Sequence, residues 1–193
     1  MRITPAPYYV GIDLAWAPGN PSGVAVIDTD ARLIEYRYTD SIEAVMDVIG
    51  GYPHCAVGVD APLIIPNETG HRPNERDFLK TFARYGLGVH AVNTVLFEKR
   101  FPCYTGFELF ARLKAAGFGF DRGNLFEVYL EVITVPNTDK KPLETLKGKA
   151  LKGEEDFLDS LVCAYTLLYC TENTCLCFGN GRIGKLLTPK PEG

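Results

Sequence analysis

The hydrophobic pattern near the start of the chain is that of short β-strands joined by turns. Residues 8–13 and 24–27 are rich in β-branched and aromatic side chains, and residues 33–38 alternate apolar with polar positions, as in a half-exposed strand. Proline, glycine and asparagine crowd residues 17–23, and the acidic turn 28–30 precedes the third segment. Such short connections predict a three-strand antiparallel meander.

Later segments alternate helical periodicity with continuous apolar runs. Apolar residues at helical spacing predict a helix over 42–49, which crosses over to a buried parallel strand at 55–60. The same signals predict further elements along the chain: helices at about 74–85, 106–116 and 154–169, a strand at 125–130, and, from Cys175, a short strand, a glycine-rich turn and a closing strand before a frayed end.

This order of elements predicts an α/β fold: a mixed sheet, with a three-strand antiparallel meander plus parallel strands, flanked by helices. Few mixed-sheet folds accommodate the order, and the ribonuclease H-like fold is the foremost. The length of 193 residues suits one domain. We therefore expect a single ribonuclease H-like domain over 1–193, with a helical insertion at about 66–120.

Composition narrows the function classes. Hydrophobic residues make up 46% and charged residues 23% of the chain, which is ordinary for a globular domain. Asp and Glu outnumber Lys and Arg by 24 to 20, so the net charge is −4. This balance excludes a protein held to nucleic acid or to membranes by bulk charge, and it leaves room for a local basic patch.

The cysteines and the apolar runs bear on location. The six cysteines contain no C-x-x-C pair, so we expect mostly buried thiols in a reducing compartment rather than a zinc or redox site. Residues 1–10 lack the charged and apolar regions of a signal peptide, and the longest apolar run, 161–170, is too short to cross a bilayer. The sequence predicts a cytoplasmic protein without a membrane partner.

Acidic residues end the predicted central strands and begin the last helix. Asp13 ends the first strand, and Asp60 ends the first parallel strand. Asp156 and Asp159 lie three residues apart, on one face of the last helix. Strand ends of an open α/β sheet meet at one edge, where ligand sites usually form. Glu127, in the strand before the last helix, is placed to join them.

Converging carboxylates repel one another unless a divalent cation lies between them. Mg²⁺ and Mn²⁺ accept hard oxygen ligands, and two such ions about 4 Å apart clamp a phosphodiester for hydrolysis. The expected catalytic acids are the metal ligands Asp13, Asp60 and Asp159 and the supporting acids Asp156 and Glu127. Which of Glu127, Asp156 or Glu131 completes the site stays open at this stage. The ordinary alternatives are that each strand-end aspartate is a turn or cap residue, and that Asp156 only complements the first turn of a helix.

These motifs resemble those of an uncharacterised family of predicted RNase H-like nucleases, domain of unknown function 429. The motif VGIDLAW at 10–16, followed by SGVAV at 22–26, looks like the first hairpin of that family. The motif GVDAPL at 58–63 is similar to its second acidic motif, and residues 156–166 look like its last-helix signature. The resemblance implies a ribonuclease H-like fold and a metal-dependent phosphodiesterase centre.

Two further segments resemble the family with substitutions. Residues 72–76 are similar to its R-x-C-D-R segment, but Asn74 and Glu75 replace the usual Cys and Asp. Residues 126–131 resemble a motif that normally has proline where Leu130 stands. These departures leave the strand acids unchanged and affect the loops that would contact a substrate.

Basic residues recur along one face of a predicted helix. Arg72, Arg76, Lys80 and Arg84 recur every four residues on one face of the second helix, and the lysines of 140–152 form a second cluster before the last helix. Charge runs of this kind are usually solvated faces. Next to a metal site they favour phosphate binding, for which the forked guanidinium groups of Arg72 and Arg76 are best suited.

Other signals are weaker. Trp16, just beyond the first strand, either stacks a substrate base or covers the core. His54, His71 and His90 lack the spacing of a metal motif, and only His71 is near the expected site loop. The glycine-rich segment 179–185 matches a phosphate-binding pattern only in part, because Leu186 stands where Ser or Thr is needed; a turn into a closing strand fits it better.

We expect a metal-dependent nuclease that hydrolyses nucleic-acid phosphodiester bonds with Mg²⁺ or Mn²⁺ by a two-metal mechanism. One alternative is a non-catalytic module that binds nucleic acid or protein on the same fold. Another is a phosphotransferase of the sugar-kinase type, which shares the fold and the first-strand aspartate but needs two such domains. The kind of nucleic acid, the direction of cleavage and the oligomeric state, a homodimer included, stay open at this stage.

Overall fold

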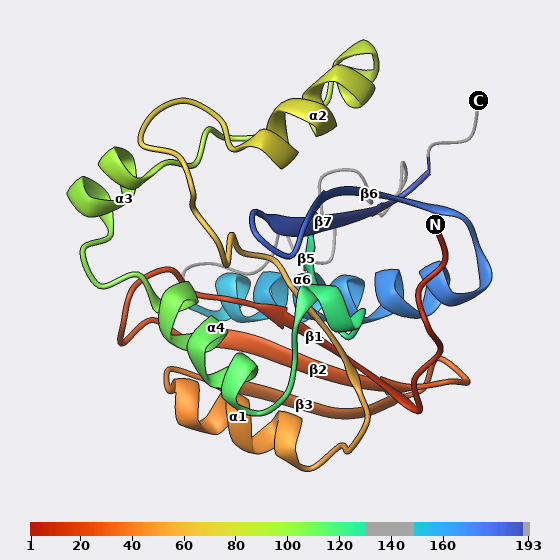
Figure 1. Cartoon of the computed structure of the whole chain (residues 1–193). Coiled ribbons are helices and arrows are strands. Elements are labelled where there is room, and N and C mark those ends of the chain that lie inside the picture. Colours follow the sequence, from red (N-terminus) through yellow and green to blue (C-terminus); the bar gives the residue numbers. More distant parts are fainter. Residues whose placement is uncertain (130–148, 191–193) are drawn as a thin grey trace.

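The computed structural model describes residues 1–129 and 149–190, which form a sheet with helices on both faces (Figure 1). Within these residues the sheet has seven strands in the order β3-β2-β1-β4-β5-β7-β6. Their bounds are β1 Tyr8–Asp13, β2 Ser22–Asp28, β3 Leu33–Thr39, β4 Ala56–Val59, β5 Leu125–Val128, β6 Cys175–Asn180 and β7 Gly184–Pro189. The first three form an antiparallel meander, β1, β4, β5 and β7 are parallel, and β6 is antiparallel to β7.

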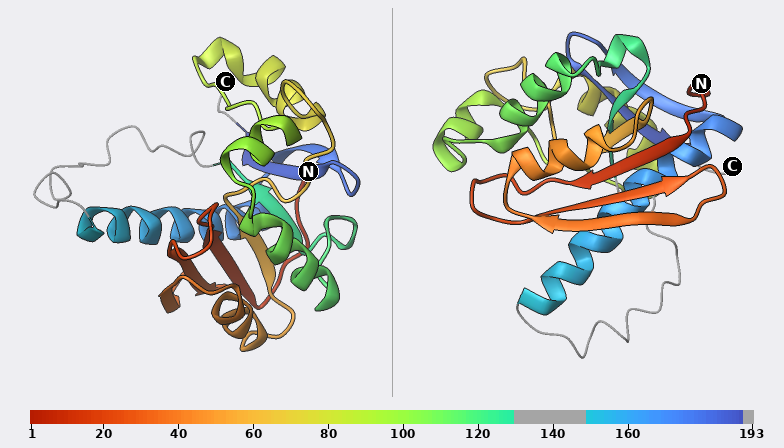
Figure 2. Two further views of the ribbon diagram at one scale, coloured as in Figure 1. Left: turned by 90° about the vertical axis from the view of Figure 1, so that its left-hand side faces the viewer. Right: turned by 90° about the horizontal axis from the view of Figure 1, so that it is seen from below.

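The helices divide between the faces of the sheet (Figure 2). α1 (Ile42–Gly50) and α4 (Thr105–Ala115) pack on one face, and α6 (Lys149–Glu172) packs on the other. Between β4 and β5 the chain also forms α2 (Pro73–Phe82), which continues as the short helix η1 (Ala83–Tyr85), then α3 (Thr94–Arg100) and the turn η2 (Phe120–Arg122). α2 packs its phenylalanines against β6 and β7.

Side-chain alternation along the central strands assigns each residue to one of two cores. Val10 and Ile12 of β1 pack with α1 and α4, whereas Tyr9 packs with α6. Leu125 of β5 belongs to the first core, and the next residue, Phe126, belongs to the second. The acidic residues at the ends of these strands follow the same alternation. It therefore decides toward which face of the sheet each acidic side chain projects.

Glycines let α6 lie directly on the backbone of the sheet. A Cβ on Gly11 of β1 would lie 1.9 Å from the carbonyl oxygen of Ser160, and a Cβ on Gly23 of β2 would lie 2.4 Å from that of Asp156. No larger residue fits at either position without moving the helix. This contact fixes the first half of α6 beside the carboxyl end of β1.

The fold confirms the predicted α/β class, the meander and the parallel strands, in a layout consistent with a ribonuclease H-like fold. The pattern did not indicate α3. This helix is seven residues long, begins with the β-branched Thr94 and Val95, and depends on Asn93, whose side chain accepts a hydrogen bond from the Leu96 amide at 2.9 Å. Its periodicity is too short to stand out in the sequence.

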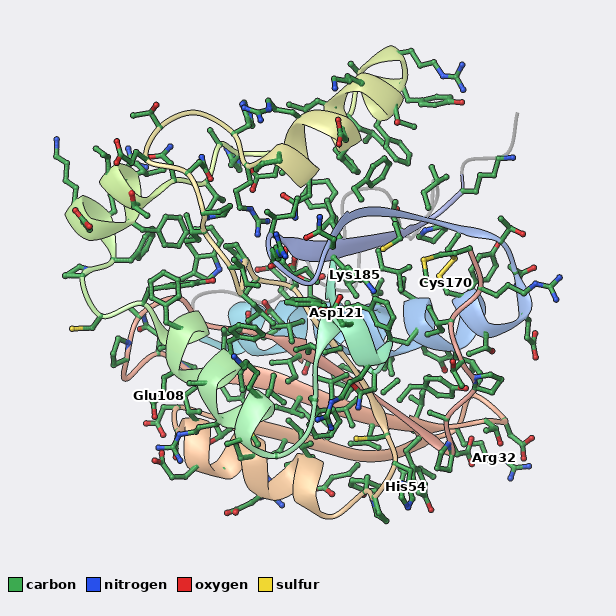
Figure 3. All side chains as sticks on the ribbon, in the orientation of Figure 1. Arg32, His54, Glu108, Asp121, Cys170 and Lys185 are labelled. Atoms are coloured by element: carbon green, nitrogen blue, oxygen red, sulfur yellow. A yellow bond between two sulfur atoms is a disulfide. The ribbon has the colours of Figure 1, made fainter. Side chains whose placement is uncertain are left out.

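The tail forms a hairpin, as the glycine-rich turn predicts, with the turn between Asn180 and Gly184. The sequence did not indicate that the closing strand, β7, lies inside the sheet between β5 and β6. One further expectation is wrong: Cys170 and Cys175 form a disulfide that links the end of α6 to the start of β6 (Figure 3), because the turn between them brings the two Cα atoms to 5.6 Å. In the described ranges, no helix is long and apolar enough to cross a membrane.

Candidate functional site

Two aspartates lie side by side where adjacent parallel strands end. β1 and β4 pair with Ile12 opposite Val59, and Asp13 and Asp60 are the next residues along the two strands, so they are neighbours. The Asp60 amide donates to the Ile12 carbonyl oxygen at 2.8 Å, which extends the pairing by one step. Both residues follow, at a spacing of two, the glycines 11 and 58 that face α6, so both project toward that helix.

The first half of α6 brings two more acids to this point. Asp156 is buried against Gly23, and Asp159 lies on the same side of the helix. Burial raises the pKa of Asp13 from 3.8 to about 8, and the charges of Asp60, Asp156 and Asp159, with a hydrogen bond to Asp156, add to the rise. The four carboxyls therefore act on one another, and we call them the acidic cluster.

A buried thiol lies beneath the acidic cluster. Burial raises the pKa of Cys163 well above its ordinary value, and the charges of Asp60, Asp13 and Asp159 act in the same direction. Its Sγ atom lies 3.9 Å from the carbonyl oxygen of Ile12. The thiol is therefore protonated at neutral pH and is a poor nucleophile.

The acidic cluster offers the donor atoms that a divalent cation site requires. Carboxylate oxygens are the donors that Mg²⁺ and Mn²⁺ prefer, and a bound cation would replace the proton that Asp13 holds at neutral pH. In the part of the chain that the structure describes, no three His, Cys, Asp or Glu side chains are already arranged to hold a metal ion. The residues fit the ion chemically, and the carboxyl groups would have to rotate toward it on binding.

Glu127 lies on the other face of the sheet from the acidic cluster. It shares the face of Leu125, two residues before it in β5, and is 1% exposed. Arg72 Nη1 donates to its two oxygens at 3.0 and 2.9 Å, and the amides of Leu63 and Ile64 donate to Oε1 at 2.7 and 3.4 Å. The structure thus separates Glu127 from the four aspartates and pairs it with the arginine.

Arg72 joins Glu127 to a second buried carboxylate. Its Nε donates to Glu75 Oε1 at 2.6 Å, and its backbone amide donates to Glu75 Oε2 at 2.8 Å, which caps α2. Burial opposes the charge on Arg72, but Glu127 and Glu75 outweigh that effect and raise its pKa. Burial also raises the pKa of Glu127, against the opposing effect of Arg72. The four hydrogen bonds donated to Glu127 favour its ionised form, so the three groups form an ionic network.

This network holds the loop that follows Asp60. Arg72 Nη1 also donates to the Ile64 carbonyl oxygen at 3.0 Å, so residues 63 and 64 are bound through both amides and one carbonyl. The Tyr104 hydroxyl donates to the Pro62 carbonyl oxygen at 2.9 Å from the other side. Burial raises the pKa of Tyr104 well above its ordinary value, and the charge of Glu127 adds to the rise. The phenol therefore stays a donor.

The remaining predicted residues lie around this core. Arg76 is exposed on α2. Trp16 is half-buried among aromatic rings, with ring centroids 5.3 Å from Phe97 and 5.2 Å from Phe101. Glu131 lies outside the described residues, and so do the lysines of the second basic cluster up to residue 148.

A pocket of about 160 Å³ joins the acidic cluster to the ionic network. Asp13 and Asp60 line one end, the three network residues line another wall, and the rest is largely apolar or aromatic: Trp16, Ala61, Pro62, Val89, His90, Val92, Val128, Tyr129 and Leu186. His90 lines this pocket, whereas the Nε2 atom of His71, the histidine that the sequence places near the site, is bonded to the Val89 carbonyl oxygen at 3.1 Å.

Sequence reasoning missed three residues of the site. Glu75 replaces the family's usual aspartate, yet it is fully buried and binds Arg72. The sequence gives no standard capping signal here, because the residue before the helix is arginine and not Ser, Thr, Asp or Asn, and only the fold shows that Glu75 caps α2. Tyr104 and His90 have no local signal, because only the path of the chain between β4 and β5 brings them to the pocket.

Comparison with known families matches the model described as "Protein of unknown function (DUF429)" to residues 11–135. The chain belongs to this family. The DUF429 match includes Asp13, Asp60, Arg72 and Glu127 and ends before α6, which supplies the other two aspartates. No curated protein and no solved structure matches the chain significantly.

Proposed function

We propose that this DUF429 protein is a metal-dependent nuclease whose centre is the acidic cluster. The observation that carries the proposal is the gathering of four carboxyls at one edge of the sheet, three of which act together with burial to raise the pKa of Asp13 to about 8. Carboxyls that repel one another destabilise a folded chain, and a bound cation would remove that repulsion.

Each carboxyl has a distinct part in this proposal. Asp13 and Asp60 are fixed by their strand ends and, with Asp159 from α6, would hold the cations. Asp156 is hydrogen-bonded to Asp13 and would orient it. When bound, Mg²⁺ or Mn²⁺ supplies an activated water and stabilises the leaving oxygen of a phosphodiester. The buried network behind Asp60 would keep that residue in place during the reaction.

A second candidate function is a non-catalytic nucleic-acid or protein-binding module. One observation favours it: within 1–129 and 149–190 no three acids are already arranged around a cation. Such a module would bind its partner equally well with and without a divalent metal, and it would leave the partner intact.

Hydrolysis assays separate the two candidates. The wild type, Asp13→Asn and Asp30→Asn are incubated with labelled single-stranded RNA, single-stranded DNA and duplexes, with Mn²⁺ or with a chelator. Asp30 is the matched control because it is exposed in the turn at the opposite end of β2. We expect Mn²⁺-dependent cleavage that Asp13→Asn lowers at least roughly 100-fold, as for loss of a strong transition-state contact, and that Asp30→Asn leaves unchanged. Binding without cleavage in either condition would favour the module.

A further inference from the structure

The pocket beside the acidic cluster contains a buried cation with hydrogen-bond donors to spare. Arg72 is 4% exposed and lines the pocket. Its Nε and Nη1 groups donate to Glu75, Glu127 and the Ile64 carbonyl oxygen. Among the described residues, Nη2 has no hydrogen-bond acceptor. A guanidinium group held on two sides in this way presents its third nitrogen in a fixed direction.

The carboxylates around Arg72 already accept several hydrogen bonds from the protein. Glu127 accepts from Arg72 and from the amides of Leu63 and Ile64, and Glu75 accepts from Arg72 and, at 3.3 Å, from the Val92 amide. Next to the network a ligand would therefore meet the N–H groups of Arg72 beside two carboxylates that already accept several hydrogen bonds, while Asp13 and Asp60 supply acceptors elsewhere in the pocket. The donors of Arg72 favour ligand atoms that accept hydrogen bonds, such as a carbonyl oxygen, a ring nitrogen or a phosphate oxygen.

Two residues of the apolar walls, Val92 and Val89, are held through their backbone groups. The Glu75 carboxylate binds the amide of Val92, and His71 binds the carbonyl oxygen of Val89. Trp16, on another wall, packs against Phe97 and Phe101. Walls that are held before a ligand arrives reduce the entropy cost of binding. Their aromatic and branched side chains suit a flat ring.

Size and charge limit what enters. About 160 Å³ is well below the roughly 300–1,000 Å³ of pockets that enclose drug-sized ligands, so the space suits one ring system with its sugar and no stacked pair. Asp13 and Asp60 at one end repel a bare phosphate, so a phosphate would stop at the cluster, where a cation holds it. The ring beyond it would reach Trp16 and Arg72.

We propose that this pocket binds one unpaired nucleotide of the substrate, with its base in the pocket and its phosphate at the acidic cluster. The inference rests on the proposed nuclease function and deepens it, because it selects substrates with a free end or an extruded base over a continuous duplex. Arg72 has the part of a specificity residue that donates from Nη2 to the base or sugar.

The test uses the fluorescence of Trp16, which is the sole tryptophan of the chain. The protein is titrated with uridine and with uridine 5′-monophosphate, each with and without Mn²⁺, and with ribose 5-phosphate as the probe that lacks a base. We expect a saturable change with uridine that needs no metal, a tighter one with the monophosphate in Mn²⁺, and none with ribose 5-phosphate.

Val89→Phe fills the pocket from its half-buried wall, and Val95→Phe makes the same change on the exposed surface of α3. We expect Val89→Phe to weaken both uridine responses at least tenfold and Val95→Phe to leave them unchanged. Far-ultraviolet circular dichroism verifies the fold, and Val89→Leu replaces Val89→Phe if the latter does not fold.

The outcomes separate the inference from the function on which it rests. No saturable uridine response in a wild type that binds Mn²⁺, or an equal response in Val89→Phe, would overturn the pocket assignment and leave the nuclease proposal standing. A uridine response that Val89→Phe removes, in a protein that neither binds Mn²⁺ nor cleaves nucleic acid, would support the pocket and overturn the nuclease proposal.

Discussion

Asp13→Asn should make the metal-free protein more stable at neutral and alkaline pH. A carboxyl whose pKa is higher in the folded protein than in the unfolded chain binds its proton more tightly in the folded state. Its contribution to stability is complete below about pH 3.8 and is lost as the pH rises to about 8. Asparagine has no proton to lose, so the substitution removes this loss and leaves a neutral side chain that still donates to Asp156.

The structure sets the size of the effect. Each tenfold change in proton affinity corresponds to about 1.4 kcal/mol, so the difference between pKa values of 3.8 and about 8 sets an upper limit of roughly 6 kcal/mol. Rotation of the carboxyls and entry of water reduce both the desolvation of Asp13 and its repulsion by the neighbouring acids, and we expect roughly 2–4 kcal/mol for Asp13→Asn at pH 8. At pH 4 the wild type and the variant should differ by less than about 1 kcal/mol.

Urea unfolding at pH 4, 6 and 8 in the presence of a chelator measures the effect. The free energy of unfolding of the wild type should fall from pH 4 to pH 8 relative to that of Asp13→Asn, and Asp30→Asn should follow the wild type. A variant that is less stable than the wild type at pH 8, or a difference that does not change with pH, would refute the reasoning. Either result would mean that burial and the neighbouring carboxyls do not raise the pKa of Asp13 in the folded chain.

Three further predictions concern the frame of the site. Gly11→Ala should cost about 1–3 kcal/mol of unfolding free energy in urea, because its Cβ would lie 1.9 Å from a carbonyl oxygen of α6, whereas Gly50→Ala, which meets nothing within 4 Å, should cost nothing. Glu127→Gln should cost about 3 kcal/mol in the same assay by leaving Arg72 short of a charge partner; a loss below about 1 kcal/mol would contradict the ionic network. Alkylation of the unfolded, unreduced chain should modify four thiols, and alkylation after reduction should modify six. Cys170→Ser should lower the free energy of unfolding by about 2 kcal/mol. Six reactive thiols without reductant would exclude the disulfide.

Some of the candidate site could be read from the sequence because its signals are local. Asp13 and Asp60 each end an apolar run, and the pairing of those runs as parallel strands is enough to place them together. Asp156 and Asp159 are related by helical spacing. The glycines of β1 and β2 also carry a local signal, since glycine inside a strand marks a close approach of backbone, here of α6.

The rest of the site depends on contacts between distant residues. Glu127 and Asp60 both belong to predicted parallel strands, yet alternation turns them to different faces, and the periodicity of a four-residue strand does not reveal which face is which. Arg72 looks like a member of a solvated stripe, and its burial depends on Glu127, 55 residues away, as well as on Glu75. His90 lines the pocket in place of His71 because of how the loop after η1 folds back.

Calorimetric titration with Mn²⁺ at pH 7 tests the central claim most directly. We expect millimolar or tighter binding to the wild type, with release of about one proton, which titrations in two buffers of different ionisation enthalpy reveal. Asp30→Asn should bind equally well, and Asp13→Asn should not bind. No binding by the wild type, or equal binding by Asp13→Asn, would contradict the assignment of the acidic cluster as a cation site.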